Sequence, residues 1–101
     1  MPNDVLETGT FSRLFETLEK PEKEWIRKVI EQLKENADVG KPLHFNWFRE
    51  KKFGGKRLYY LVYKKSSNVL LVAFCSKKEQ QKIIKHILEN REKYKRLVEG
   101  N

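Results

Sequence analysis

The sequence predicts one α+β domain over residues 1–101, in the order (β)ααβββα. In this architecture an antiparallel sheet packs against an N-terminal helical hairpin and a long C-terminal helix. Two observations predict it. Apolar residues recur at helical spacing before residue 40 and after residue 76, and strand-type patterns fill residues 43–75. A length of 101 residues suffices for one hydrophobic core and is too short for two ordinary domains.

Two amphipathic helices are expected before residue 40. The first carries apolar residues at i, i+3, i+4 and i+7, namely Phe11, Leu14, Phe15 and Leu18. Its N-cap is expected at Thr8 or Thr10. Pro21 suits the first turn of the second helix, which is expected to end near residues 36–38. The short segment 4–7 is a candidate strand that leads into this hairpin.

Three strands and a final helix are expected next. Residues 43–53 alternate with period two, Gly54 and Gly55 signal a hairpin turn, and residues 57–63 are aromatic and branched. Residues 69–75 are nearly all apolar, which predicts a central strand buried on both faces. Ser76 and Glu79 match a capping box at the start of the last helix.

The charge of the chain is concentrated in its middle. The net charge is +8 and the isoelectric point is about 9.6. Residues 41–65 contain eight basic residues and one acidic residue, a net charge of +7. Clustered Lys and Arg are typical of proteins that bind polyanions, so nucleic acid or the ribosome is the expected partner.

Several classes of protein are excluded by composition. The longest apolar run, Val69 to Cys75, is too short to span a membrane, and the N-terminus lacks a signal-peptide pattern. The single cysteine, Cys75, excludes an internal disulfide framework and is expected to be a small buried hydrophobe. No spacing of His, Cys, Asp and Glu resembles a metal site. We therefore expect a cytoplasmic protein without a metal or cofactor.

The candidate functional residues lie around the predicted hairpin turn. Five cations flank it and are expected to converge at one end of the sheet: Arg49, Lys51, Lys52, Lys56 and Arg57. The alternative is that these residues form a solvated hairpin tip without a binding function. Lys77 and Lys78, at the start of the last helix, are candidates for phosphate contact. Tyr59 and Tyr94 are candidates for contact with RNA, although a core role is the usual one for such aromatics.

These residues resemble a known family. The segments that carry the resemblance are residues 47–53 (WFREKKF), 55–63 (GKRLYYLVY) and 74–78 (FCSKK), within a likeness that covers roughly residues 9–97. They resemble the RelE/ParE toxin superfamily, with its HigB-like branch nearest. The resemblance implies the toxin half of a type II toxin–antitoxin pair, bound by an acidic antitoxin. RelE-like members enter the ribosome and cut mRNA, whereas ParE-like members inhibit DNA gyrase.

Residue roles follow from this resemblance. Arg57 matches the strand arginine that helps to hold the scissile phosphate in cleaving members. Arg49, Lys51 and Lys52 fall where those members carry basic catalytic residues. Phosphate stabilisation is assigned to Arg49 together with Arg57, and proton transfer to Lys51 or Lys52. Lys56, Lys77, Lys78, Tyr59 and Tyr94 are then candidates for contact with RNA or the ribosome. One departure is that Ile83 and Ile84 occupy the region where some cleaving relatives place a catalytic tyrosine.

We therefore consider three alternative functions, in order of preference. The first is a metal-independent, ribosome-dependent mRNA endonuclease that inhibits translation. The second is a ParE-like toxin that inhibits DNA gyrase without cutting nucleic acid. The third is an inactive relative that binds nucleic acid.

Overall fold

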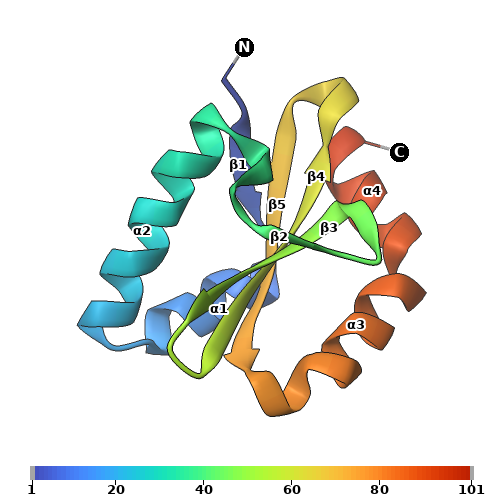
Figure 1. Ribbon diagram of the computed structural model, residues 1–101. Helices are drawn as coiled ribbons and strands as arrows, with labels where there is room; N and C mark the ends of the chain where they lie inside the picture. Colours follow the sequence, from blue (N-terminus) through green and yellow to red (C-terminus); the bar gives the residue numbers. More distant parts are fainter. Residues whose placement is uncertain (1, 101) are drawn as a thin grey trace.

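The computed structural model describes residues 2–100 and contains a five-stranded mixed sheet in the order β1-β5-β4-β3-β2. The strands are β1 (Asp4–Glu7), β2 (Lys41–Leu43), β3 (Phe45–Phe53), β4 (Lys56–Tyr63) and β5 (Asn68–Ser76). The helices are α1 (Gly9–Thr17), α2 (Lys20–Glu35), α3 (Gln80–Glu89) and α4 (Arg91–Glu99). Figure 1 shows α1 and α2 on one side of the sheet and α3 and α4 on the other. This is the α+β architecture that the sequence predicts.

The sheet separates two hydrophobic clusters. On β4, Leu58, Tyr60 and Val62 pack into the cluster under α1 and α2, which we call the α2 face. Tyr59 and Leu61 pack into the cluster under α3 and α4, which we call the α3 face. Side chains alternate between faces along a strand, so each strand residue can be assigned to one face.

Several local predictions are confirmed. Thr8 is the N-cap of α1, and its hydroxyl accepts a hydrogen bond from the Phe11 N–H at 3.0 Å. Pro21 lies in the first turn of α2. The two-residue turn at Gly54 and Gly55 joins β3 to β4, with Gly54 at a φ of 58° that glycine adopts without steric cost.

The order of strands differs from the prediction in two ways. β1 forms as expected, but it pairs parallel with β5, so the sheet is mixed rather than wholly antiparallel. β4 is the middle strand, and β5 is buried on both faces without being central. The sheet is mixed because β1 adds to the outer edge of β5, which the pattern of residues 69–75 does not encode, and β4 is in the middle because β3 and β2 follow on its other side.

Two predicted elements differ in their boundaries. His44 adopts a φ of 64°, so the strand predicted over residues 43–53 begins as β3 at Phe45, and Leu43 is the last residue of a separate short strand, β2. The long C-terminal helix stops at Asn90, whose side-chain amide donates to the His86 carbonyl oxygen at 2.8 Å. Asn favours such local hydrogen bonds over a continuing helix, so α4 begins as a separate helix.

The predicted capping box before the last helix does not form. The Ser76 side chain makes no capping hydrogen bond, and a 3-10 turn over Lys77–Glu79 precedes α3. The Lys77 N–H instead donates to the Gly55 carbonyl oxygen at 3.1 Å. This bond ties the turn to the β3–β4 hairpin, and α3 begins only after Glu79.

Candidate functional site

The strand register distributes the predicted catalytic cations over both faces of the sheet. Lys52 lies opposite Arg57 on the α3 face. Arg49 lies opposite Tyr60 and Lys51 opposite Leu58, which places both on the α2 face. The structure therefore brings Lys52 and Arg57 together and separates them from Arg49 and Lys51.

Arg49 is held in place by its surroundings. Its Nη1 donates to the Gly40 carbonyl oxygen at 2.7 Å, and its Nε donates to the Asn46 carbonyl oxygen at 2.9 Å. Its Nη2 lies 3.2 Å from the Asp38 carboxylate, and only 10% of the side chain is exposed. With these contacts Arg49 supports the β2–β3 hairpin, and it lies on the opposite face of the sheet from Arg57.

Arg57 faces a buried carboxylate. Its Nε lies 4.0 Å from Glu50 Oε2, and both side chains are less than a tenth exposed. The same Glu50 oxygen accepts a hydrogen bond from Gln80 Nε2 at 2.7 Å. The sequence interpretation counted Glu50 only as a charge among bases. Glu50 and Lys52 are two residues apart on β3, so their side chains point to the same face, and Lys52 pairs with Arg57. This spacing was the signal in the sequence that could have placed Glu50 beside Arg57.

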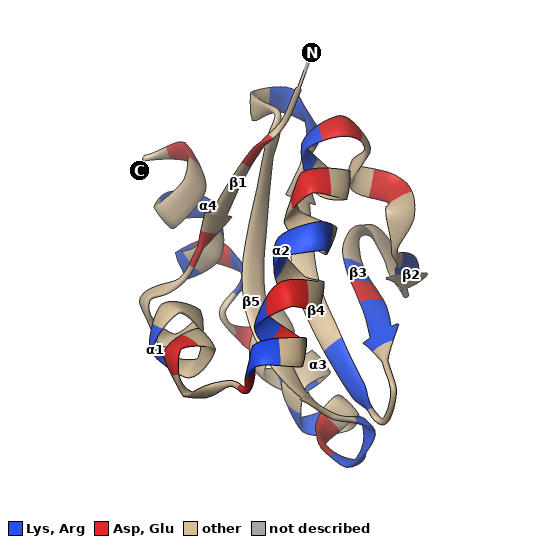
Figure 2. Ribbon diagram, turned by 90° about the vertical axis from the view of Figure 1, so that its left-hand side faces the viewer, with Lys and Arg blue, Asp and Glu red and all other residues tan. Residues whose placement is uncertain are grey.

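Lysines gather at one end of the sheet. Four of them form no ion pair within residues 2–100: Lys51, Lys52, Lys77 and Lys78. We call these four residues the basic end. Figure 2 shows basic segments of β3 close to the turn before α3. Lys56 also lies at this end, but its ammonium group binds the Glu22 carboxylate of α2.

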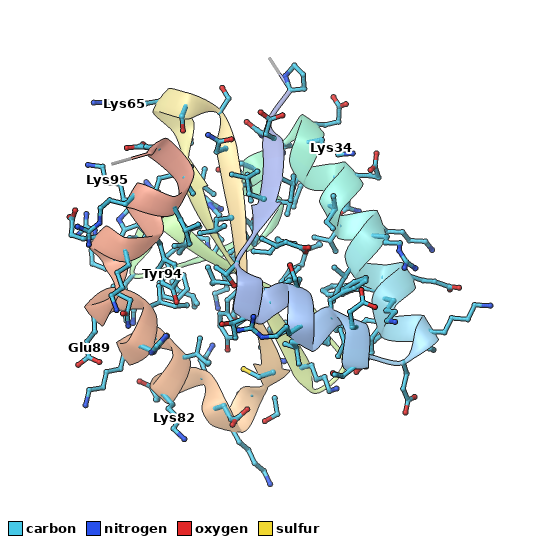
Figure 3. The ribbon with its side chains drawn as sticks, turned by 180° about the vertical axis from the view of Figure 1, so that it is seen from behind. Lys34, Lys65, Lys82, Glu89, Tyr94 and Lys95 are labelled. Atoms are coloured by element: carbon cyan, nitrogen blue, oxygen red, sulfur yellow. The ribbon has the colours of Figure 1, made fainter. Side chains whose placement is uncertain are left out.

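The two tyrosines predicted to contact RNA are both packed against the sheet. Tyr59 is fully buried, and its hydroxyl has no hydrogen-bond partner within residues 2–100. Burial is the main reason that the pKa of Tyr59 is raised to about 12. Tyr94 is half-buried, and Figure 3 shows its ring on the inner side of α4, whereas Lys95 points outward. Neither ring is freely accessible for stacking.

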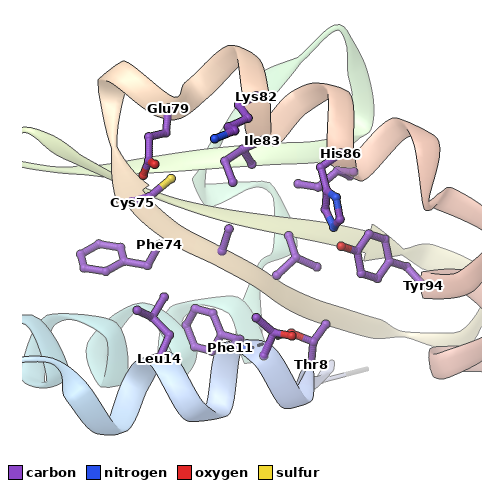
Figure 4. A pocket seen from close by; sticks show the side chains of 14 residues that line it. Thr8, Phe11, Leu14, Phe74, Cys75, Glu79, Lys82, Ile83, His86 and Tyr94 are labelled. Carbon is purple, nitrogen blue, oxygen red and sulfur yellow. Dashed lines mark hydrogen bonds between the residues drawn. The ribbon is translucent and has the colours of Figure 1, made fainter.

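A groove of about 520 Å³ lies along the outer edge of β5, between α1 and α3. β1 pairs with β5 only as far as Leu71, whereas β5 continues to Ser76. Figure 4 shows Phe11 of α1 and Ile83 of α3 on opposite walls, with Cys75 on the floor. Cys75 is thus half-buried in the groove rather than fully buried in the core. Burial raises the pKa of its thiol.

The described residues offer no obvious metal site. Within residues 2–100, no group of three or more His, Cys, Asp or Glu side chains is arranged to hold a metal ion. In the same part of the chain, no helix is long and apolar enough to cross a membrane.

Solved structures of known proteins share this arrangement of elements. A free mutant of the E. coli toxin RelE superimposes with a TM-score of 0.71, covering 86% of this chain and 99% of that one at 16% identity. The chain has the RelE toxin fold. The RelBE2 toxin–antitoxin complex of Mycobacterium tuberculosis matches with a TM-score of 0.65 at 21% identity, covering 76% of this chain and 100% of the matched chain.

A complex confirms the same RelE fold. The intact E. coli RelBE toxin–antitoxin complex matches with a TM-score of 0.66 at 15% identity, covering 73% of this chain and 95% of the matched chain. Neither a protein-family model nor a curated protein sequence matches the chain. The likeness to RelE is thus carried by the arrangement of helices and strands, and the chemistry must be argued from the side chains of this chain.

Proposed function

We propose that this chain is the toxin of a type II toxin–antitoxin pair and that it cuts mRNA on the ribosome. The observation that carries the proposal is the placement of Glu50, Lys52 and Arg57 on one face of the sheet, next to the basic end. The RelE fold supports a toxin, and the four unpaired lysines support an RNA partner. A carboxylate, a guanidinium and an ammonium group are sufficient for RNA cleavage without a metal ion.

The proposed chemistry is attack by the RNA's own 2′-hydroxyl group. Glu50 accepts the 2′-hydroxyl proton, the 2′-oxygen attacks phosphorus, and the bond from phosphorus to the 5′-oxygen breaks. Arg57 stabilises the negative charge that develops on the phosphate oxygens. The Lys52 ammonium group gives a proton to the departing 5′-oxygen. The products are a 2′,3′-cyclic phosphate and a 5′-hydroxyl group.

This assignment revises the roles expected from the sequence. The base becomes Glu50, because Lys51 lies on the opposite face of the sheet. Arg49 becomes a structural residue for the reasons given above. Gln80 becomes a positioning residue, since its amide orients the Glu50 carboxylate. Its side chain must move aside before RNA reaches the buried pair, which makes ribosome-bound RNA the expected substrate.

The test is induced expression followed by mapping of mRNA 5′ ends. We expect new ends at fixed codon positions with the wild type, and their loss with Arg57→Ala and Glu50→Gln. Lys52→Ala is expected to reduce cleavage, whereas Lys65→Ala, at the opposite end of β4, removes the same charge and should leave cleavage unchanged. Circular dichroism of each purified variant separates lost chemistry from lost folding. Unchanged ends in folded Arg57→Ala would refute the nuclease proposal.

Two features favour a second function. The Glu50 carboxylate offsets the charge of Arg57, and Ile83 and Ile84 occupy the region of the family's catalytic tyrosine. Both features suit a toxin that binds a protein such as DNA gyrase and cuts nothing. Growth arrest without new mRNA ends, together with loss of DNA supercoiling activity, would support this alternative.

The proposed partner is an acidic antitoxin. A chain with a net charge of +8 attracts an acidic protein at long range, so association should be fast and should slow as salt is added. Surface plasmon resonance with the protein encoded next to this one, at increasing salt, measures this effect. A salt-independent association rate would argue against a charge-driven encounter.

A further inference from the structure

Three aromatic rings form a stack that runs from the core to the surface at the start of β3. Phe48 is fully buried, Trp47 is half-buried, and Phe45 is 41% exposed. The Trp47 and Phe48 ring centroids lie 6.0 Å apart at an interplanar angle of 21°. Those of Phe45 and Trp47 lie 5.0 Å apart at 17°. The rings are therefore nearly parallel, and the outermost one meets solvent.

The position of this stack in the sheet explains its exposure. Pairing between β3 and β4 begins at Phe48, so Phe45 and Trp47 lie in the part of β3 that is not paired with β4. His44, just before them, holds a φ of 64° that non-glycine residues rarely adopt. A constrained backbone thus directs large apolar rings to a surface position, where polar residues would be expected in a hairpin of this size.

A cation completes the cluster. The Arg91 guanidinium carbon lies 4.7 Å from the Trp47 ring centroid, within the range of a cation–π contact. Arg91 is the first residue of α4 and is exposed, so the guanidinium group has one side against an aromatic ring and the other toward solvent. Planar rings beside an exposed arginine are the combination that binds single-stranded nucleic acids.

We propose that Phe45, Trp47 and Arg91 form a stacking site for an unpaired base of single-stranded RNA. The exposed ring of Phe45 offers its face to the base, and Arg91 binds a neighbouring phosphate. Charge favours RNA over an apolar protein partner: β3 leads from Phe45 to Lys52 at the basic end, about 24 Å away at roughly 3.4 Å per residue. RNA lying along β3 would contact both sites.

The inference rests on the proposed function in naming RNA as the ligand, but it does not require cleavage. Sequence reasoning selected Tyr59 and Tyr94 for contact with RNA, and the structure points instead to Phe45 and Trp47. Base–aromatic stacking accounts for roughly a five- to hundredfold change in affinity per base. That change is what the test measures.

The two tryptophans of the chain allow a direct test. Trp25 packs against Phe53 and Phe74 on the α2 face, so Trp25→Phe leaves Trp47, at the proposed site, as the single tryptophan whose fluorescence is excited selectively at about 295 nm. This variant is titrated with an oligouridylate and with an abasic oligonucleotide of equal length and charge. We expect saturable quenching by the oligouridylate, and binding of the abasic strand at least fivefold weaker and without quenching.

Matched variants separate stacking from charge. Phe45→Leu in the Trp25→Phe background should weaken oligouridylate binding at least fivefold and leave the affinity for the abasic strand unchanged. Phe45→Tyr keeps an aromatic ring and should retain the affinity for the oligouridylate. Arg91→Ala should weaken binding of both strands, while Lys95→Ala, an exposed lysine on the same helix, should do so less. Urea denaturation confirms that each variant is folded.

The outcomes distinguish this inference from the proposed nuclease. Equal affinity for the two strands, or unchanged binding by folded Phe45→Leu, would overturn the stacking site even if the chain cuts mRNA. Base-dependent quenching in the non-cleaving Arg57→Ala variant would support the stacking site, whatever the fate of the nuclease proposal.

Discussion

Tyr59 and Tyr60 are neighbours on β4 and both are fully buried, yet only one of their hydroxyl groups is hydrogen-bonded. The Tyr60 hydroxyl accepts from the Gly40 N–H at 2.8 Å and donates to the Ala37 carbonyl oxygen at 2.8 Å. These bonds tie the turn between α2 and β2 to the middle strand. The Tyr59 hydroxyl has no partner within residues 2–100.

Replacing each tyrosine by phenylalanine therefore gives opposite expectations. Tyr60→Phe leaves the buried Gly40 N–H and the part-buried Ala37 carbonyl unpaired, and should lower the free energy of unfolding by about 2–3 kcal/mol. For a domain of this size that is a fall in melting temperature of roughly 10–20 °C. Tyr59→Phe removes a hydroxyl group that is withdrawn from water on folding and forms no hydrogen bond within residues 2–100. It should leave the stability unchanged or raise it by up to about 1 kcal/mol.

Urea denaturation at neutral pH, followed by circular dichroism, measures both variants against the wild type. Each substitution removes one oxygen from an adjacent, equally buried ring, so each serves as the control for the other. Equal losses of stability, or a larger loss for Tyr59→Phe, would refute the assignment of these hydrogen bonds.

Three further predictions concern close packing and titration. Gly40→Ala should destabilise the fold by about 1–3 kcal/mol, because an added Cβ would lie 2.6 Å from the Glu50 carbonyl oxygen; an unchanged urea midpoint would contradict this close approach. The hydrogen bond from Lys56 is the main reason that the pKa of Glu22 is lowered from its usual value of 4.5. The ion pair therefore stabilises the fold fully above pH 4.5, and this stabilisation is lost as the pH falls through the lower pKa that Glu22 has in the folded protein. Glu22→Gln should therefore flatten the acid side of the stability–pH curve, and identical curves would exclude the contribution. Because burial raises the pKa of Cys75 above 9.0, its alkylation by iodoacetamide at neutral pH should be slower than that of a free thiol and should accelerate in alkali, whereas a fast neutral reaction would contradict this placement.

The general architecture could be predicted because its signals are local. Helical spacing, a two-residue glycine turn and branched runs report on the backbone of their own segments. The parallel pairing of β1 with β5 could not be predicted, because four residues do not specify a distant partner. The break at Asn90 was missed because the apolar stripe continues across it into α4.

The candidate site was harder to predict from the sequence, because strand register decides which residues lie together in it. A shift of one residue moves every side chain of a strand to the opposite face. The turn at Gly54 and Gly55 pairs Phe53 with Lys56, and counting back from it places Lys52 opposite Arg57. The same count places Lys51 on the opposite face from Arg57 and Glu50 on the same face as Arg57. The partners of Arg49, by contrast, come from the irregular turn before β2, which no periodicity encodes.

The pairing of β1 with β5 also constrains how the chain folds as it is synthesised. Residues 4–7 are synthesised well before their strand partners, residues 68–71. This edge of the sheet thus closes only after residue 71 has been made, and contacts between such distant segments form slowly. The helical hairpin of α1 and α2 can form earlier from local contacts. The sheet is therefore completed only after residue 71 has been made, whereas the local β3–β4 hairpin, which aligns Glu50 with Arg57, can form before its outer edge closes.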